Sequence, residues 1–140
     1  MMQRIITLGV FAALCVAVVP ATAGAETTTT ATAISCVKTA VDTREAALAT
    51  GWDTFSSAVK SAYSARKTAL ADAYSKTSTT EVRTAVRTAW KTFKTSTRSA
   101  RSAWQKTRGD AWKTSKTAAK ACKAPSGVED SGNSGTDTSV

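Results

Sequence analysis

The chain has 140 residues, a formal net charge of +9 and no histidine. Histidine is the commonest general base and the commonest metal ligand, so its absence weighs against acid–base catalysis and against a metal site. The sequence also contains no Gly-rich phosphate loop and no spacing of cysteines or carboxylates typical of metal ligands. We therefore predict a protein that is not an enzyme, holds no cofactor or metal, and has no small-molecule substrate.

The first 25 residues have the three parts of a secretory signal peptide. Arg4 supplies the positive charge, residues 5–19 form an almost unbroken apolar run, and small residues follow from Pro20. The apolar run is shorter than the roughly 20 residues that a transmembrane helix needs. We expect cleavage after Ala23 or Ala25, and a mature protein that is secreted, periplasmic or associated with the cell envelope.

Two polar segments flank the rest of the mature chain. Residues 26–32 are rich in threonine, and residues 124–140 hold the acids Glu129, Asp130 and Asp137 but no base. Both segments lack the large apolar side chains whose burial would offset the entropy of ordering them. The first is predicted to be a flexible linker and the second a disordered acidic tail.

Between these segments, apolar residues recur every three or four positions, which is the period of an α-helix. The pattern predicts one helix over residues 33–77 and a second over residues 79–123. Ser78, followed three residues later by Glu81, forms a capping box that starts the second helix. The sequence therefore predicts an all-α domain over residues 33–123, folded as a long antiparallel helical hairpin like a coiled coil.

Folding back at Thr79 places residues opposite one another when their numbers add to about 158. Cys36 meets Cys122 in that register, and an exported protein can oxidise the pair, so we predict a disulfide that closes the open end of the hairpin. The same register predicts four ion pairs between the helices: Asp42 with Lys116, Glu45 with Lys113, Asp53 with Lys106, and Asp72 with Arg87.

Gly51 and Gly109 fall at nearly the same level of the predicted hairpin. Glycine in a helix interior costs about 1 kcal/mol relative to alanine. Either both helices bend at these residues, or each helix breaks and the hairpin becomes a shorter four-helix bundle. The bent hairpin is the preferred prediction because the apolar pattern continues through both glycines.

In the second helix, a basic residue follows nearly every predicted core position by one place. One residue is a rotation of 100°, so these bases form a continuous stripe along one flank of the helix contact. Nucleic acids, anionic envelope polymers and lipid head groups would bind such a stripe by releasing counterions. The alternative is a solvated flank that pairs with the acids of the first helix. The predicted polyanion-binding residues are Arg83, Arg87, Lys91, Lys94, Arg98, Arg101, Arg108, Lys116, Lys120 and Lys123.

Trp112 departs from the predicted core positions and lies on the basic flank between Arg108 and Lys116. An exposed tryptophan among bases suits a membrane interface, or stacking on a nucleobase or sugar. The alternative is packing against the partner helix or a second chain. The remaining tryptophans, Trp52, Trp90 and Trp104, are predicted to belong to the core.

A hairpin of two helices offers only one contact surface to its aromatic residues, and exposed apolar surface tends to find a partner. These features support three hypotheses. The leading one is a non-enzymatic protein that binds polyanions or an anionic membrane surface through the second helix. The second is a structural or spacer protein of the envelope that forms homodimers, and the third is a membrane-active amphipathic protein.

Three sequence motifs resemble those of known proteins. They are C-V-K-T-A-V-D-T-R-E-A-A from Cys36, R-T-A-W-K-T-F from Arg87 to Phe93, and A-A-K-A-C ending at Cys122. Together they resemble a group of uncharacterised small exported bacterial proteins with a cysteine-bounded, Ala- and Lys-rich helical hairpin. The resemblance covers residues 36–122 and implies the same hairpin. No activity or site is attached to that group, so the resemblance implies no function.

Overall fold

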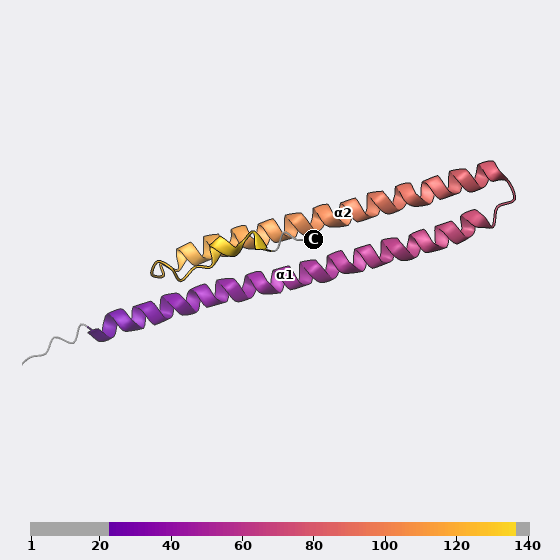
Figure 1. Cartoon of the computed structure of the whole chain (residues 1–140). Coiled ribbons are helices and arrows are strands. Elements are labelled where there is room, and N and C mark those ends of the chain that lie inside the picture. Colours follow the sequence, from indigo (N-terminus) through magenta and orange to yellow (C-terminus); the bar gives the residue numbers. More distant parts are fainter. Residues whose placement is uncertain (1–22, 137–140) are drawn as a thin grey trace, which may run out of the picture.

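The computed structural model of the chain describes residues 23–136, with side chains from residue 29 onward. Two long helices, α1 (Ala23–Tyr74) and α2 (Thr79–Ala121), run antiparallel and lie side by side (Figure 1). A single 3₁₀ turn, η1 (Ser131–Asn133), follows in the C-terminal segment. The predicted all-α hairpin is confirmed, and residues 23–136 contain no strand. The predicted signal peptide lies almost wholly outside the described residues.

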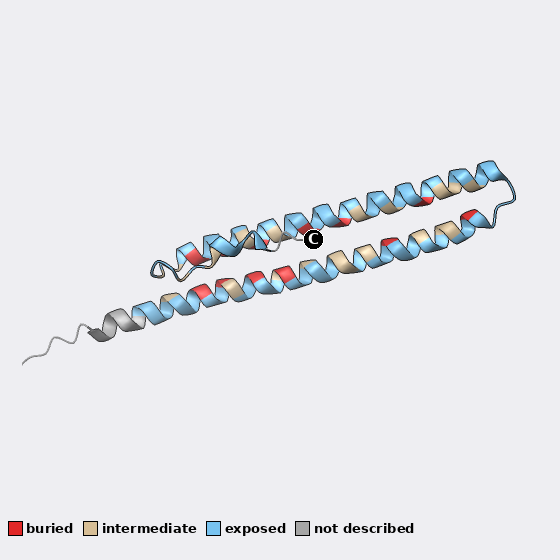
Figure 2. Cartoon of the chain, viewed as in Figure 1, coloured by how far each residue is buried: buried red, intermediate tan, exposed pale blue. Residues whose placement is uncertain are grey.

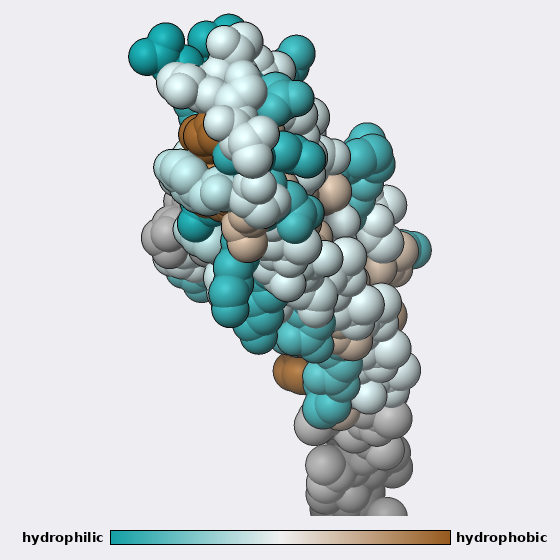
Figure 3. Space-filling model, turned by 90° about the vertical axis from the view of Figure 1, so that its right-hand side faces the viewer, coloured by the Kyte–Doolittle hydropathy of each residue, from teal (hydrophilic) through white to brown (hydrophobic). Residues whose placement is uncertain are grey.

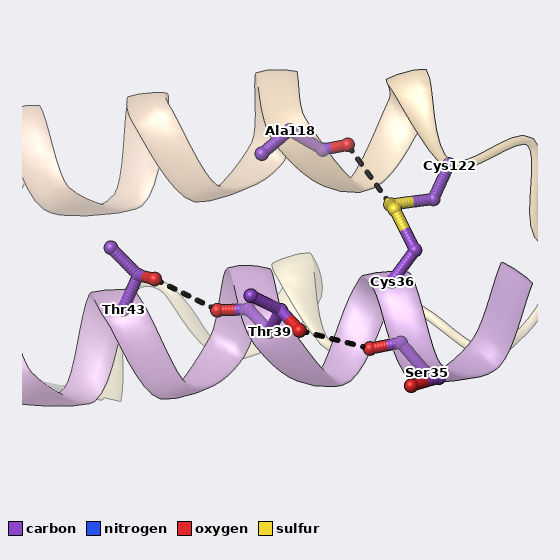
Figure 4. Close-up of a disulfide and its surroundings, with 6 residues drawn as sticks. All are labelled: Ser35, Cys36, Thr39, Thr43, Ala118 and Cys122. Atoms are coloured by element: carbon purple, nitrogen blue, oxygen red, sulfur yellow. Dashed lines mark hydrogen bonds between the residues drawn. A yellow bond between two sulfur atoms is a disulfide. The ribbon is translucent and has the colours of Figure 1, made fainter. Parts of the chain in front are cut away.

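The helix bounds differ from those predicted. α1 begins at Ala23, so residues 26–32, predicted to be a flexible linker, are helical. Further along α1, threonine hydroxyls bond to a carbonyl one turn back. The Thr39 hydroxyl donates to the Ser35 carbonyl at 3.2 Å, and the Thr43 hydroxyl donates to the Thr39 carbonyl at 2.8 Å (Figure 4).

The turn between the helices spans residues 75–78, so α1 ends at Tyr74 and not at residue 77. Ser78 occupies the N-cap position of α2, as predicted, and its carbonyl accepts the Val82 N–H at 3.0 Å. The capping box itself was predicted wrongly, because the Ser78 side chain makes no capping hydrogen bond. α2 ends at Ala121, two residues early, and Lys123 then takes a left-handed conformation (φ 51°) that no helix continues.

The buried residues, red in Figure 2, lie along the sides of the two helices that face each other, and most of them are alanine. Trp104 is the one large aromatic side chain that is buried among the described residues. Trp52 and Trp90 are 42% and 41% exposed, so their assignment to the core was wrong. Two helices cover each aromatic ring on one side only, which leaves the other side in solvent. The buried apolar residues are Val37, Ala40, Leu48, Ala62, Ala73, Ala89, Ala100, Trp104, Ala111 and Ala119.

The two glycines play different roles within unbroken helices. A Cβ atom on Gly51 would lie 2.8 Å from Thr107 Cγ2 and 3.0 Å from Trp104 Cζ3. Gly51 is therefore needed for the close approach of α2. Around Gly109 there is nothing within 4 Å of such a Cβ atom. Neither glycine interrupts its helix, so the alternative of a shorter four-helix bundle is wrong.

The Cys36–Cys122 disulfide joins the helices at their open end, as predicted (Figure 4). The two Cα atoms are 5.7 Å apart, within the usual range for a disulfide. The Cys122 sulfur lies 3.3 Å from the Ala118 carbonyl oxygen. The bond therefore fixes the register in which α1 and α2 meet.

None of the four predicted ion pairs between the helices forms in the described part of the chain. Asp42 pairs with Lys38 one turn back on its own helix, and Lys106 pairs with Asp110 one turn ahead. Glu45 pairs with its neighbour Arg44. The register brings residues to the same level of the hairpin, but only side chains that point into the helix contact can meet across it.

Candidate polyanion-binding surface

The predicted basic residues lie along one flank of α2 and continue just beyond it; we call this set the basic stripe. Nine of its ten members are exposed, and Arg108 is half-buried. At 1.5 Å per residue, the stripe from Arg83 to Lys120 is about 55 Å long. Figure 3, seen from the turn, shows hydrophilic side chains in teal along the surface with only separate hydrophobic spots.

Within residues 29–136, the nine exposed members of the basic stripe have no acidic partner. None of the nine forms an ion pair or stacks on an aromatic ring in that part of the chain. The pairing of this flank with the acids of the first helix was therefore predicted wrongly, whereas the flank is solvated, as the alternative also predicted. The charge of the stripe faces solvent, where it is open to an external anion.

Lys106 and Asp110 form the one ion pair within α2 in the described part of the chain, at 2.6 Å. The hydrogen bond from Lys106 lowers the pKa of Asp110, and the same bond raises the pKa of Lys106. Lys106 is not a member of the basic stripe. The pair therefore leaves the charge of the stripe intact.

Residues 124–136 of the acidic tail, which was predicted to be disordered, lie against the helices. Residues 124–136 turn back along the helical pair (Figure 1), and Asp130 reaches Arg44 on α1. Arg44 Nη1 and Nη2 each donate to one carboxylate oxygen of Asp130 at 2.7 Å. Arg44 also donates from Nε and Nη2 to the Glu45 carboxylate at 2.9 and 2.7 Å. The two-pronged contact is the strongest arrangement that an arginine and a carboxylate can form.

The electrostatics of Arg44 follow from these contacts. Its side chain is only 4% exposed, whereas that of Asp130 is 44% exposed. The hydrogen bonds to Asp130 raise the pKa of Arg44 further, and the same bonds lower the pKa of Asp130. Arg44 is thus a buried cation that depends on the tail for part of its neutralisation.

Trp112 is half-buried, and it is not the exposed aromatic residue that its position suggested. The Arg44 guanidinium carbon lies 3.9 Å from the centre of the Trp112 ring, close enough for a cation–π contact. Trp112 also packs against the small cluster of Leu48, Trp104 and Ala111. The structure therefore favours the alternative of packing against the partner helix.

A second arginine of α1 lies on aromatic rings. The Arg66 guanidinium carbon is 4.2 to 4.7 Å from the ring centres of Phe93, Trp90 and Tyr63. Tyr63 meets Phe93 edge to face at 4.9 Å. Sequence reasoning missed both Arg44 and Arg66. The available signal was their position: each lies at the three- and four-residue spacing of the apolar residues around it.

Other surfaces offer less to an anion. A groove of about 630 Å³ runs between the helices near the disulfide, with walls mainly of alanine, threonine and serine. In residues 23–136, no group of three or more His, Cys, Asp or Glu side chains could share a metal ion. Within the same residues, no helix is long and apolar enough to cross a membrane.

Comparisons with protein-family models, with curated proteins and with solved structures gave no match to the chain. The resemblance to small exported hairpin proteins therefore stays a prediction. The geometry and the charge of the chain's own side chains are the grounds on which a function can be proposed.

Proposed function

We propose that the protein is an exported, non-enzymatic binding protein whose α2 helix holds a polyanion along the basic stripe. One observation carries the proposal: nine exposed bases lie along one flank of α2 and just beyond its end, without any acid paired with them in residues 29–136. Ten charges over about 55 to 60 Å give one charge about every 6 Å. A chain of phosphates can meet many of these charges at once and release the counterions it had condensed.

The distribution of charge favours a linear polymer over a flat membrane. A membrane surface would touch both helices, yet α1 carries five bases and five acids. α2 carries eleven bases and two acids, and most of the bases follow one line. We therefore favour a phosphate-bearing polymer, such as a nucleic acid or an anionic envelope polymer, over lipid head groups as the ligand.

Salt dependence tests the proposal. The mature protein is titrated with duplex DNA and, separately, with vesicles of anionic lipid at about 50 and about 200 mM salt. Contacts from only four bases would already make log K fall with log salt concentration at a slope of about −3.6. Binding to DNA that weakens steeply with salt supports the proposal. No binding to DNA at low salt would contradict it, and binding to vesicles alone would shift it to membranes.

A second candidate is a dimeric spacer protein, and the exposed aromatic residues favour it. Trp52, Tyr63, Tyr74 and Trp90 are between 41% and 70% exposed. Such residues often become buried in a protein interface. A stable dimer by analytical ultracentrifugation, together with indifference to DNA and vesicles, would support the spacer over the binding protein.

A further inference from the structure

We propose that Arg44 and Trp112 form a second anion-binding site, which the acidic tail occupies and which a linear polyanion takes over when it displaces the tail. The inference rests on the proposed function, because the incoming ligand is the polyanion of the basic stripe. It assigns a role to residues of α1 and of the tail that the stripe itself does not include.

The site has the chemistry of an oxyanion receptor. Arg44 presents two N–H groups side by side to the two oxygens of Asp130. A phosphate group offers the same pair of oxygens, and the arginine fork matches the geometry of both phosphate and carboxylate. The Trp112 ring against the guanidinium holds the fork in place, with 3.9 Å between them. Asp130 therefore stands where one anionic group of a polymer would bind.

The site lies beside the basic stripe. Trp112 is on α2, one turn from both Arg108 and Lys116 of the stripe. Lys116 lines the same small groove as Arg44, Trp112 and the tail residues Glu129 and Asp130. A polymer that follows the stripe toward the disulfide would therefore reach Arg44 next, and there it would meet the two acids of the tail.

The tail is held in a way that allows release. Beyond Asp130 the described tail is Ser-Gly-Asn-Ser-Gly-Thr, without an apolar side chain to anchor it. Val128 is half-buried, and Asp130 of the segment forms an ion pair with Arg44. Segments with few buried apolar contacts open at low cost. The docked tail blocks the Arg44 site. The apparent affinity for the polyanion is therefore reduced to the fraction of molecules in which the tail is released.

The test compares two full-length variants with the same change in charge. Asp130→Asn weakens the hold on the tail, whereas Asp53→Asn removes an exposed acid of α1 that forms no ion pair in the described residues. We expect Asp130→Asn to bind duplex DNA about fivefold tighter or more. Asp53→Asn should stay close to the parent. A double variant, Asp130→Asn with Arg44→Met, should lose the gain while keeping the helical circular dichroism spectrum.

The release of the tail is observed directly by NMR. In ¹⁵N spectra of the parent protein, saturating DNA should move the amide signals of residues 129–136 toward unstructured positions. Tail signals that stay unchanged on DNA binding would overturn the inference, as would equal affinities of the Asp130→Asn and Asp53→Asn variants. A gain on anionic vesicles but not on DNA would overturn the choice of a linear polymer. If no variant binds DNA or vesicles, the proposed function itself fails.

Discussion

α1 and α2 lie side by side but use their basic residues differently. α1 has equal numbers of bases and acids, and α2 has eleven bases against two acids. The two arginines of α1, Arg44 and Arg66, lie against aromatic rings of α2. The nine exposed bases of the stripe, on α2 and just beyond its end, point into solvent and form no ion pair with an acid in residues 29–136. One helix thus uses its arginines for packing, and the other displays its charge.

The difference shows that position on the helix decides what a base does. Arg44 and Arg66 lie at apolar spacing, so their stems turn toward the helix contact, where Arg44 is buried and Arg66 is half-buried. The bases of the stripe come one residue after the apolar positions, and a rotation of 100° carries them out of the contact. A shift of one residue therefore separates a structural base from one that is open to a ligand.

The different roles of α1 and α2 depend on the two helices staying in contact. Loss of the disulfide is expected to weaken this contact most. Cys36 and Cys122 are separated by 86 positions. Closing a loop of that length stabilises the fold by about 4 to 5 kcal/mol in the chain-entropy model. Reduction, or the double variant Cys36→Ser and Cys122→Ser, should lower the melting temperature by more than about 10 °C. An unchanged thermal melt would show that the helix contact alone holds the hairpin.

The next largest effects come from one substitution made at matched sites on the two helices. Gly51→Ala places a methyl group against Thr107 and the buried Trp104 ring, at 2.8 and 3.0 Å. Overpacking of this kind costs about 1 to 3 kcal/mol. Gly109→Ala meets open space, so the better helix propensity of alanine should stabilise the protein by about 0.5 to 1 kcal/mol. Urea unfolding measures both, and effects of the same sign would contradict the close approach at Gly51.

The smallest effect concerns the tail and depends on pH. Arg44 lowers the pKa of Asp130, so the contact favours the docked tail above the ordinary aspartate pKa of about 3.9. Docking should be lost as the pH falls through the lowered pKa of Asp130. Glu45, Glu129 and Lys116 also face this region. NMR of the tail amides from pH 6 downward should show release with the helices intact, and tail signals that do not change when the Asp130 carboxylate becomes protonated would refute the contact.

Much of the fold could be predicted from the sequence because helices follow local rules. The three- and four-residue period indicated the two helices, and the near-equal distances of Cys36 and Cys122 from the turn indicated the register. The start of α2 at Thr79 followed from Ser78. The ion pairs between the helices could not be predicted in the same way. The register determines which residues of the two helices lie at the same level of the hairpin, but it does not determine where their side chains point.

The contact between Asp130 and Arg44 could not be predicted from the sequence, for a different reason. Residues 124–140 are mostly polar and have few apolar side chains to bury, and this composition predicts disorder. The contact that orders the tail needs a buried cation 86 residues away in the chain, and Arg44 becomes one only when Trp112 and the helix contact surround it. The basic stripe, in contrast, was visible in the sequence because it depends on spacing within a single helix.

The most direct test of the central claim removes equal charge from the two helices. One triple variant changes three bases of the stripe to glutamine, and its matched control changes three exposed bases of α1. The substituted residues are Arg87, Lys91 and Lys94 in the first protein and Lys38, Lys60 and Lys67 in the second.

Duplex DNA affinity is then measured for both proteins across a range of salt concentrations. The α2 variant should bind about tenfold more weakly or worse at low salt, and its salt slope should shrink by about 2.7 because three phosphate contacts are lost. The α1 variant should keep the slope of the parent. Equal losses in the two variants would contradict the claim that the polyanion follows the basic stripe of α2.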